Sequence, residues 1–332
     1  MESSFLPAPS SFGNIIKAPG GMLVKRHGDA MKILCLDGGG IRGVYALAIL
    51  ESIEKEFNGP VSRHFDLLAG TSTGSIIAAA AAIQKDMGTI LEMYREYGKR
   101  IFNRQSTIGL WGSMYSDRYL RKLLKKAFGD LNLADVPKPL LIPAVDLTHG
   151  RPFVHRSNVP GDGEDIPLKL WDAVLSSCSA PVYFPPNNVE NKYLSIDGGL
   201  WANNPSLVCL SEGIHYFREN LESISILSLG TGLQKVDFSY PAEKNWGIGR
   251  WLPIRWPSLK VEPKLLDLAL DISSESVSYH CSLLLGKQYF RINRELGQEM
   301  PFDEIAYTET LIQLGKETFA EQKSDIAAFL QI

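Results

Sequence analysis

A serine stands between glycines in the pentapeptide Gly70-Thr71-Ser72-Thr73-Gly74. An apolar stretch typical of a strand, residues 65–69, precedes it, and an alanine-rich stretch typical of a helix follows it. G-x-S-x-G between a strand and a helix is the pattern of a nucleophile elbow, in which glycines permit a sharp turn. The serine then lies at the positive end of the helix. An ordinary turn has the same composition, but the flanking elements favour a nucleophile at Ser72.

A serine nucleophile requires a base that accepts its proton. Only His215 and His280 come late enough in the chain for the order of an α/β hydrolase, and both fall in segments with helical spacing. We interpret both as histidines that pack a helix. Asp197 ends the predicted strand 193–196, and the carboxyl ends of strands are where open α/β sheets build their sites. We therefore predict that Asp197 is the base for Ser72.

A run of three glycines, residues 38–40, follows the predicted strand 32–36 and opens a helix. Together with Gly43 it fits G-x-G-x-x-G, the turn of dinucleotide-binding folds, which requires an acidic residue about 20 positions later. The next strand ends in the Ser72 pentapeptide instead, so we set that interpretation aside. Successive backbone N–H groups at a helix start suit an anion or a developing oxyanion.

Five segments together resemble the motifs of patatin-like phospholipases, the Ser–Asp dyad acyl hydrolases related to plant patatins. They are Asp37-Gly-Gly-Gly-Ile-Arg-Gly43, Gly70-Thr-Ser-Thr-Gly74, Ser179-Ala-Pro-Val-Tyr-Phe-Pro185, Asp197-Gly-Gly-Leu-Trp-Ala-Asn-Asn-Pro205 and Ser228-Leu-Gly-Thr-Gly232. All five occur in the family's order.

The resemblance implies roles for individual residues. Ser72 matches the nucleophile and Asp197 the base, while Gly39 and Gly40 match the amides of the oxyanion hole. Gly38 and Arg42 complete that loop. The remaining matched motif positions are Gly43, Gly70, Thr71, Thr73, Gly74, Gly198 and Gly199.

The implied chemistry is a two-step acyl transfer that releases a fatty acid from a phospholipid or galactolipid ester. It needs no metal ion and no cofactor, and the sequence contains no H-E-x-x-H motif and no EF-hand loop. The alternatives are a constitutive lipid acyl hydrolase without specificity and a storage or binding protein with incidental esterase activity.

Predicted strands alternate with predicted helices along the chain. The strands are expected at 32–36, 65–69, 140–145, 153–155, 193–196 and 224–229, and the helices at 44–57, from 75, 90–102, 116–128, 168–176, 207–217, 264–285 and 308–330. This order predicts an α/β fold with a largely parallel sheet covered on both faces, and the resemblance implies the patatin-like three-layer version. We expect one domain over 31–332 after a poorly ordered extension, residues 1–30.

Composition excludes several classes of protein. The 332 residues carry 34 Lys and Arg against 37 Asp and Glu, a net charge of −3, so neither DNA nor RNA is an expected partner. The longest apolar run, residues 76–83, is far shorter than the roughly 20 residues of a membrane span. Four scattered cysteines and the lack of a secretory signal predict a cytoplasmic protein. The resemblance to phospholipases implies that it associates peripherally with membranes when active.

Two segments suggest membrane contact. Residues 231–263 hold Trp246, Trp251 and Trp256 among arginines, a composition that suits a lid or a membrane-facing loop. Packing of these tryptophans on the body is an equal alternative. The basic face of the helix at 116–128 is either an ordinary solvated face or a site for anionic headgroups.

Regulation is a further hypothesis from the resemblance, because compact bacterial relatives include antiviral effectors that cyclic nucleotides activate. A cyclic di- or trinucleotide needs cations for its phosphates and aromatic rings for its bases. The candidate cations are Arg95, Lys99, Arg100 and Arg104, together with the basic helix from Arg118, and the candidate rings are Tyr94, Tyr97 and Phe102. Control through assembly into a homo-oligomer is also left open.

Overall fold

The computed structural model describes residues 30–103, 112–160, 167–234, 254–255, 260–261 and 264–332. Its main sheet has eight strands in the order β10-β7-β1-β2-β3-β6-β5, with β4 paired to β3. The bounds are β1 (Met31–Leu36), β2 (Leu67–Gly70), β3 (Leu140–Asp146), β4 (Arg151–Ser157), β5 (Asn187–Val189), β6 (Tyr193–Asp197), β7 (Ile224–Leu229) and β10 (Tyr289–Ile292). A separate two-stranded sheet pairs β8 (Ile254–Arg255) with β9 (Lys260–Val261).

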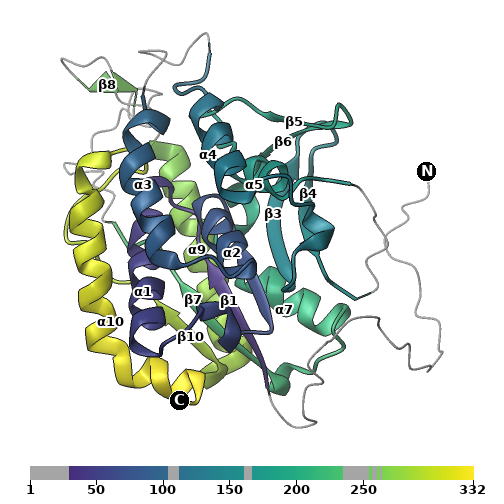
Figure 1. Cartoon of the computed structure of the whole chain (residues 1–332), viewed down its shortest axis with the longest axis vertical. Coiled ribbons are helices and arrows are strands. Elements are labelled where there is room, and N and C mark those ends of the chain that lie inside the picture. Colours follow the sequence, from purple (N-terminus) through teal and green to yellow (C-terminus); the bar gives the residue numbers. More distant parts are fainter. Residues whose placement is uncertain (1–29, 104–111, 161–166, 235–253, 256–259, 262–263) are drawn as a thin grey trace, which may run out of the picture.

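Helices cover both faces of the main sheet (Figure 1). They are α1 (Gly43–Glu56), α2 (Thr73–Ala82), α3 (Met87–Ile101), α4 (Arg118–Phe128), α5 (Leu170–Cys178), α6 (Gly199–Ala202), α7 (Ser206–His215), α9 (Lys264–Leu285) and α10 (Thr308–Leu330). Successive side chains of β1 point to opposite faces of the sheet and belong to different parts of the core. Leu34 and Leu36 pack with the larger cluster that includes α1 to α5, whereas Ile33 and Cys35 pack with the cluster under α7. The predicted three-layer α/β class is confirmed.

Strand direction positions the site. Strands β10, β7, β1, β2 and β3 are parallel, so their carboxyl ends share one edge. β6 is antiparallel to β3 and pairs through residues 144–146, beyond the point where β2 pairs with residues 140–141. The ends of β2 and β6 therefore approach each other along β3.

Some sequence-based expectations need correction or lie outside the described residues. The short strands β5 and β10 were not predicted, and α4 begins at Arg118 rather than at residue 116, with Asp117 as its N-cap. Most of the expected lid and nearly all of the N-terminal extension fall outside the described ranges. Within those ranges, no helix is long and apolar enough to cross a membrane.

Candidate active site

Ser72 lies in a sharp turn between β2 and α2, at the N-cap of the helix. Its backbone has φ 52° and ψ −125°, a conformation that costs a non-glycine residue energy and is typical of functional turns. A Cβ at Gly70 would lie 2.1 Å from the carbonyl oxygen of Gly74, and a Cβ at Gly74 would lie 2.3 Å from that of Leu36. The two flanking glycines are thus required by close backbone packing.

Hydrogen bonds hold this turn in place. The Ser72 N–H donates to Ser177 Oγ at 2.9 Å, and that hydroxyl donates to the Pro143 carbonyl at 2.6 Å. The Ser72 carbonyl accepts from Ser75 Oγ at 2.6 Å and from Cys178 Sγ at 3.1 Å. Both backbone groups of the strained residue are therefore fixed by buried side chains.

Asp197 is the partner of the Ser72 hydroxyl. The hydroxyl donates a hydrogen bond to the buried carboxylate, which also accepts from the Gly199 N–H at 2.7 Å. Burial raises the pKa of Asp197 to about 6, although these two hydrogen bonds lower it. A carboxylate with a pKa near neutrality is suited to accept and return a proton.

The sequence argument pointed to Asp197 for a reason that the structure corrects. β6 is antiparallel, so its last residue does not lie at the shared carboxyl edge by strand direction. Asp197 reaches Ser72 because it sits opposite Ala144, near the end of β2. His215 and His280 are exposed on α7 and α9 rather than packed in the core, and neither lines the cavity at Ser72.

The glycine loop places two amides beside the nucleophile. The Gly38 N–H donates to the Asn203 carbonyl at 3.0 Å, whereas those of Gly39 and Gly40 have no hydrogen-bond partner among the described residues. Gly39 and Gly40 line the same cavity as Ser72 and Asp197. Gly40 has φ +55°, and a Cβ there would lie 2.3 Å from the Phe302 carbonyl. Two of the four residues expected at the oxyanion hole therefore present free donors.

Arg42 lies beneath the loop rather than in the cavity. Its buried guanidinium donates from Nη2 to Asp271 Oδ1 at 2.9 Å and lies 4.0 Å from the centre of the Phe302 ring. Nε and Nη1 have no partner among the described residues. The contacts tie the glycine loop to α9 and to residue 302.

The other predicted motif residues pack the site together. A Cβ at Gly43 would lie 2.4 Å from Thr73 Cγ2, and a Cβ at Gly198 would lie 2.2 Å from the Pro143 carbonyl. Thr71 Oγ1 donates to the Ala202 carbonyl at 2.6 Å. Thr73 Oγ1 lies 2.6 Å from the Tyr94 hydroxyl, which links the elbow to α3.

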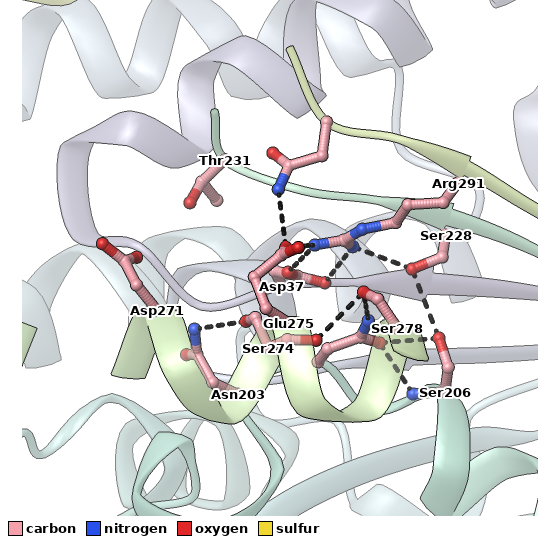
Figure 2. Close-up of polar contacts among 12 residues, drawn as sticks. Asp37, Asn203, Ser206, Ser228, Thr231, Asp271, Ser274, Glu275, Ser278 and Arg291 are labelled. Carbon is pink, nitrogen blue, oxygen red and sulfur yellow. Dashed lines mark hydrogen bonds and ion pairs between the residues drawn. The ribbon is translucent and has the colours of Figure 1, made fainter. Parts of the chain in front are cut away.

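A buried ion pair behind the loop was missed by sequence reasoning (Figure 2). Asp37, at the end of β1, accepts from Nη1 and Nη2 of Arg291 at 2.8 and 2.6 Å. Nη1 also donates to Ser228 Oγ at 2.9 Å. Burial raises the pKa of Asp37 even though Arg291 lowers it. Arg291 lies on the unpredicted strand β10, and no motif surrounds it.

Two cavities meet at Ser72. The first is lined by the catalytic candidates together with Asn203, Leu270 and Phe302. The second runs between α2, α3 and α4, is almost wholly apolar, and shares Ser72, Phe102 and Phe184 with the first. Its wall includes Ile76, Ile101, Leu120 and Leu123. This apolar channel opens beside the nucleophile, so it suits the hydrocarbon part of an acyl ester.

Comparison with known proteins identifies the family. A model of the patatin-like phospholipase family matches residues 34–210, a span that contains Ser72 and Asp197. The cUMP-AMP-activated phospholipase of Escherichia coli is 29% identical over 335 residues, covering 94% of this chain and 98% of that protein. The cGAMP-activated phospholipase of Pseudomonas aeruginosa is 29% identical over 268 residues, covering 79% and 77%. Patatin-like protein 1 of Oryza sativa subsp. indica is 30% identical over 301 residues, covering 77% and 71%. The chain therefore belongs to the patatin-like phospholipase family and is a serine acyl hydrolase.

Proposed function

We propose that the protein hydrolyses acyl esters of membrane phospholipids with Ser72 as nucleophile and Asp197 as base. The observation that supports this most directly is the hydrogen bond from the Ser72 hydroxyl to the buried Asp197 carboxylate. Beside it lie the amides of Gly39 and Gly40, which have no partner in the part of the chain that the structure describes. Asp197 takes the hydroxyl proton as Oγ attacks the ester carbonyl. The two amides stabilise the tetrahedral oxyanion, and one such donor is typically worth about 3 kcal/mol.

The second half of the cycle uses the same groups. Collapse of the tetrahedral intermediate returns the proton from Asp197 to the leaving lysophospholipid and leaves an acyl ester on Ser72. Water then attacks that ester, with Asp197 as its base, and the fatty acid leaves. Among the described residues, no histidine lines either cavity, so the dyad needs no third member.

Covalent labelling with a fluorophosphonate probe tests the assignment. We expect the intact protein to be labelled and Ser72→Ala to be unlabelled, with Ser211→Ala as the control because Ser211 is an exposed serine on α7 that lines neither cavity at Ser72. Labelling of Ser72→Ala would overturn the choice of nucleophile. A labelled protein that fails to hydrolyse any phospholipid would favour a storage or binding role.

We also propose peripheral action at a membrane and activation by a cyclic di- or trinucleotide. The names of the two bacterial relatives, a cUMP-AMP-activated and a cGAMP-activated phospholipase, support the activation. Arg104 lies outside the described residues. Tyr94 and Tyr97 are buried, and Phe102 lines the apolar cavity, so these rings are not displayed for base stacking.

The cations that face an open groove are Arg95 and Lys99, on the side of α3 that faces residues 305–309. Arg95 donates from Nε and Nη2 to the two carboxylate oxygens of Glu309, at 2.8 and 2.9 Å. A ligand phosphate would compete with Glu309 for this guanidinium. Tyr94 lines the same groove, and its hydroxyl bonds Thr73 next to the nucleophile. A ligand bound in the groove would act on Ser72 through this contact.

Vesicle hydrolysis across a panel of cyclic di- and trinucleotides tests the activation. We expect low basal activity that rises at least about tenfold with one member of the panel, and a weaker response in Lys99→Ala than in the control Lys192→Ala, which changes an exposed lysine between β5 and β6. High basal activity that no nucleotide changes would leave a constitutive hydrolase.

A further inference from the structure

The carboxamide of Asn203 lies between the glycine loop and the turn that follows Asp197. Asn203 is the C-cap of α6 and is buried. A Cβ at Gly38 would lie 2.3 Å from Asn203 Oδ1, and a Cβ at Gly199 would lie 2.9 Å from the same atom. Glycine at both positions therefore leaves room for this one side chain.

Asn203 binds Gly38 on two sides. The Asn203 carbonyl accepts from the Gly38 N–H at 3.0 Å, and Asn203 Nδ2 donates to the Gly38 carbonyl at 3.3 Å. The hydroxyl of Thr231, which is also buried, donates to the same carbonyl at 3.4 Å. Two buried side-chain donors thus fix the direction of one carbonyl in the glycine loop.

The same carboxamide is anchored to α9. Asn203 Nδ2 donates to Ser274 Oγ at 2.8 Å (Figure 2) and to the Leu270 carbonyl at 3.2 Å. An amide nitrogen has two hydrogens, so at least one of them is shared among these acceptors and the Gly38 carbonyl. Rotation of the side chain would break several of these bonds at once, and Asn203 is therefore held in one orientation.

The fixed carbonyl sets the direction of the Gly39 N–H. The Gly38 carbonyl and the Gly39 N–H belong to one peptide unit, which is planar and trans, so the two groups point in opposite directions. The Gly39 N–H has no partner among the described residues, and Gly39 lines the cavity at Ser72. A hydrogen bond to the carbonyl also polarises the peptide and strengthens its N–H as a donor.

We propose that Asn203 is a positioning residue that directs the Gly39 amide at the developing oxyanion. It acts through the peptide between Gly38 and Gly39 and does not itself touch the reacting atoms. Asn203 and the base Asp197 belong to one short segment, residues 197–203, so this segment holds the oxyanion donor and the base relative to each other. The inference rests on the proposed function, in which Gly39 stabilises the oxyanion.

Hydrolysis of the soluble ester p-nitrophenyl butyrate tests the positioning role. Asn203→Ala keeps the backbone bond to the Gly38 N–H but removes the nearer side-chain donor from the Gly38 carbonyl. We expect kcat to fall at least about tenfold, a part of the roughly 100-fold or more that loss of a whole oxyanion donor costs. KM should change less than about twofold, because the amide acts on the transition state rather than on the bound ester.

Asn204→Ala is the matched control. Asn204 is also buried, and its Nδ2 donates to Ser278 Oγ at 3.2 Å and to the Tyr289 hydroxyl at 3.0 Å. The variant therefore removes contacts with α9 but none with the glycine loop, and its kcat should stay within about twofold of wild type. Thermal unfolding checks that each variant is folded. Thr231→Val, which removes the second donor to the Gly38 carbonyl, should also lower kcat at constant KM and provides the test should Asn203→Ala not fold.

Hydrogen exchange of residues 37–43, followed by mass spectrometry, gives a readout that does not depend on catalysis. We expect faster exchange of this segment in Asn203→Ala than in wild type or Asn204→Ala, because the bond to the Gly38 N–H is no longer held by the side chain. A wild type that hydrolyses no ester would refute the proposed function. The exchange would still decide whether Asn203 holds the loop.

Three outcomes would overturn the proposal. Exchange of residues 37–43 at the wild-type rate in Asn203→Ala would show that Asn203 does not hold the loop. An unchanged kcat with a raised KM would make Asn203 a residue that binds substrate instead. An equal loss of kcat in folded Asn203→Ala and folded Asn204→Ala would assign the effect to general loosening of the contacts with α9.

Discussion

Asp197→Asn should inactivate the enzyme and at the same time stabilise it in a pH-dependent way. Burial raises the pKa of Asp197 from 3.8 to about 6, so the folded state binds this proton more tightly than the unfolded state. The contribution of Asp197 to the free energy of unfolding is therefore fully present below about pH 4. It is lost as the pH rises through about 6. A pKa difference of about 2 corresponds to about 3 kcal/mol.

Asparagine removes the ionisation but keeps the shape of the side chain. Its oxygen still accepts from the Gly199 N–H, a bond of 2.7 Å in the wild type. We therefore expect the unfolding free energy of Asp197→Asn, relative to wild type, to rise by about 3 kcal/mol between pH 4 and pH 8. For a chain of this length that is a relative gain of about 4 °C in melting temperature.

Thermal unfolding of both proteins from pH 4 to pH 8 provides the measurement. Burial also raises the pKa of Asp267, to about 7, but this group is present in both proteins and cancels in the difference. A difference between the two proteins that stays constant with pH would refute the raised pKa. Near wild-type turnover by Asp197→Asn would refute its role as base. In the wild type, kcat/KM should fall about tenfold per pH unit well below pH 6.

The remaining predictions concern the channel, the ion pair and metal dependence. Leu123→Phe should narrow the apolar channel and lower kcat/KM for long-chain relative to short-chain p-nitrophenyl esters, while Leu123→Ala should raise that ratio; equal changes on all chain lengths would place the acyl chain elsewhere. Arg291→Leu leaves the buried Asp37 carboxylate without its partner and should cost about 3–5 kcal/mol in chemical denaturation, with partial recovery in the double variant that adds Asp37→Asn. Hydrolysis should survive EDTA, because no step of the proposed cycle uses a metal; a strict Ca²⁺ requirement would contradict the mechanism.

The sequence predicted those parts of the site that depend on short segments. Ser72 and its glycines are recognisable because the elbow is built within five residues, and α9 and α10 begin and end where helical spacing does. Which amides of the glycine loop are free to donate could not be predicted in the same way. Whether the Gly38 amide is free depends on the Asn203 carbonyl, 165 positions later, so the sequence grouped Gly38 with Gly39 and Gly40.

Arg291 marks the limit of sequence reasoning. It contacts Asp37 across 254 positions, from a strand of only four residues that shows no clear alternation. Asp197 illustrates a different limit, since the residue was identified from the order of elements but the antiparallel direction of β6 was not. The Arg291–Asp37 ion pair and the direction of β6 both depend on contacts between residues distant in sequence. Local sequence patterns do not predict such contacts.

α9 contacts the catalytic loop from a point late in the chain. Its inner face holds that loop in several places, since Asp271 binds Arg42 and the Ser274 hydroxyl accepts from Asn203 at 2.8 Å. A hydrogen bond from Ser274 also lowers the pKa of Asp37, so one helix contacts both the start of the glycine loop and Arg42 within it. Because these contacts come from a distant helix, the glycine loop is not held by its own segment alone. The positions of the Gly39 and Gly40 amides, on which stabilisation of the oxyanion depends, therefore rest on contacts that no short sequence pattern encodes.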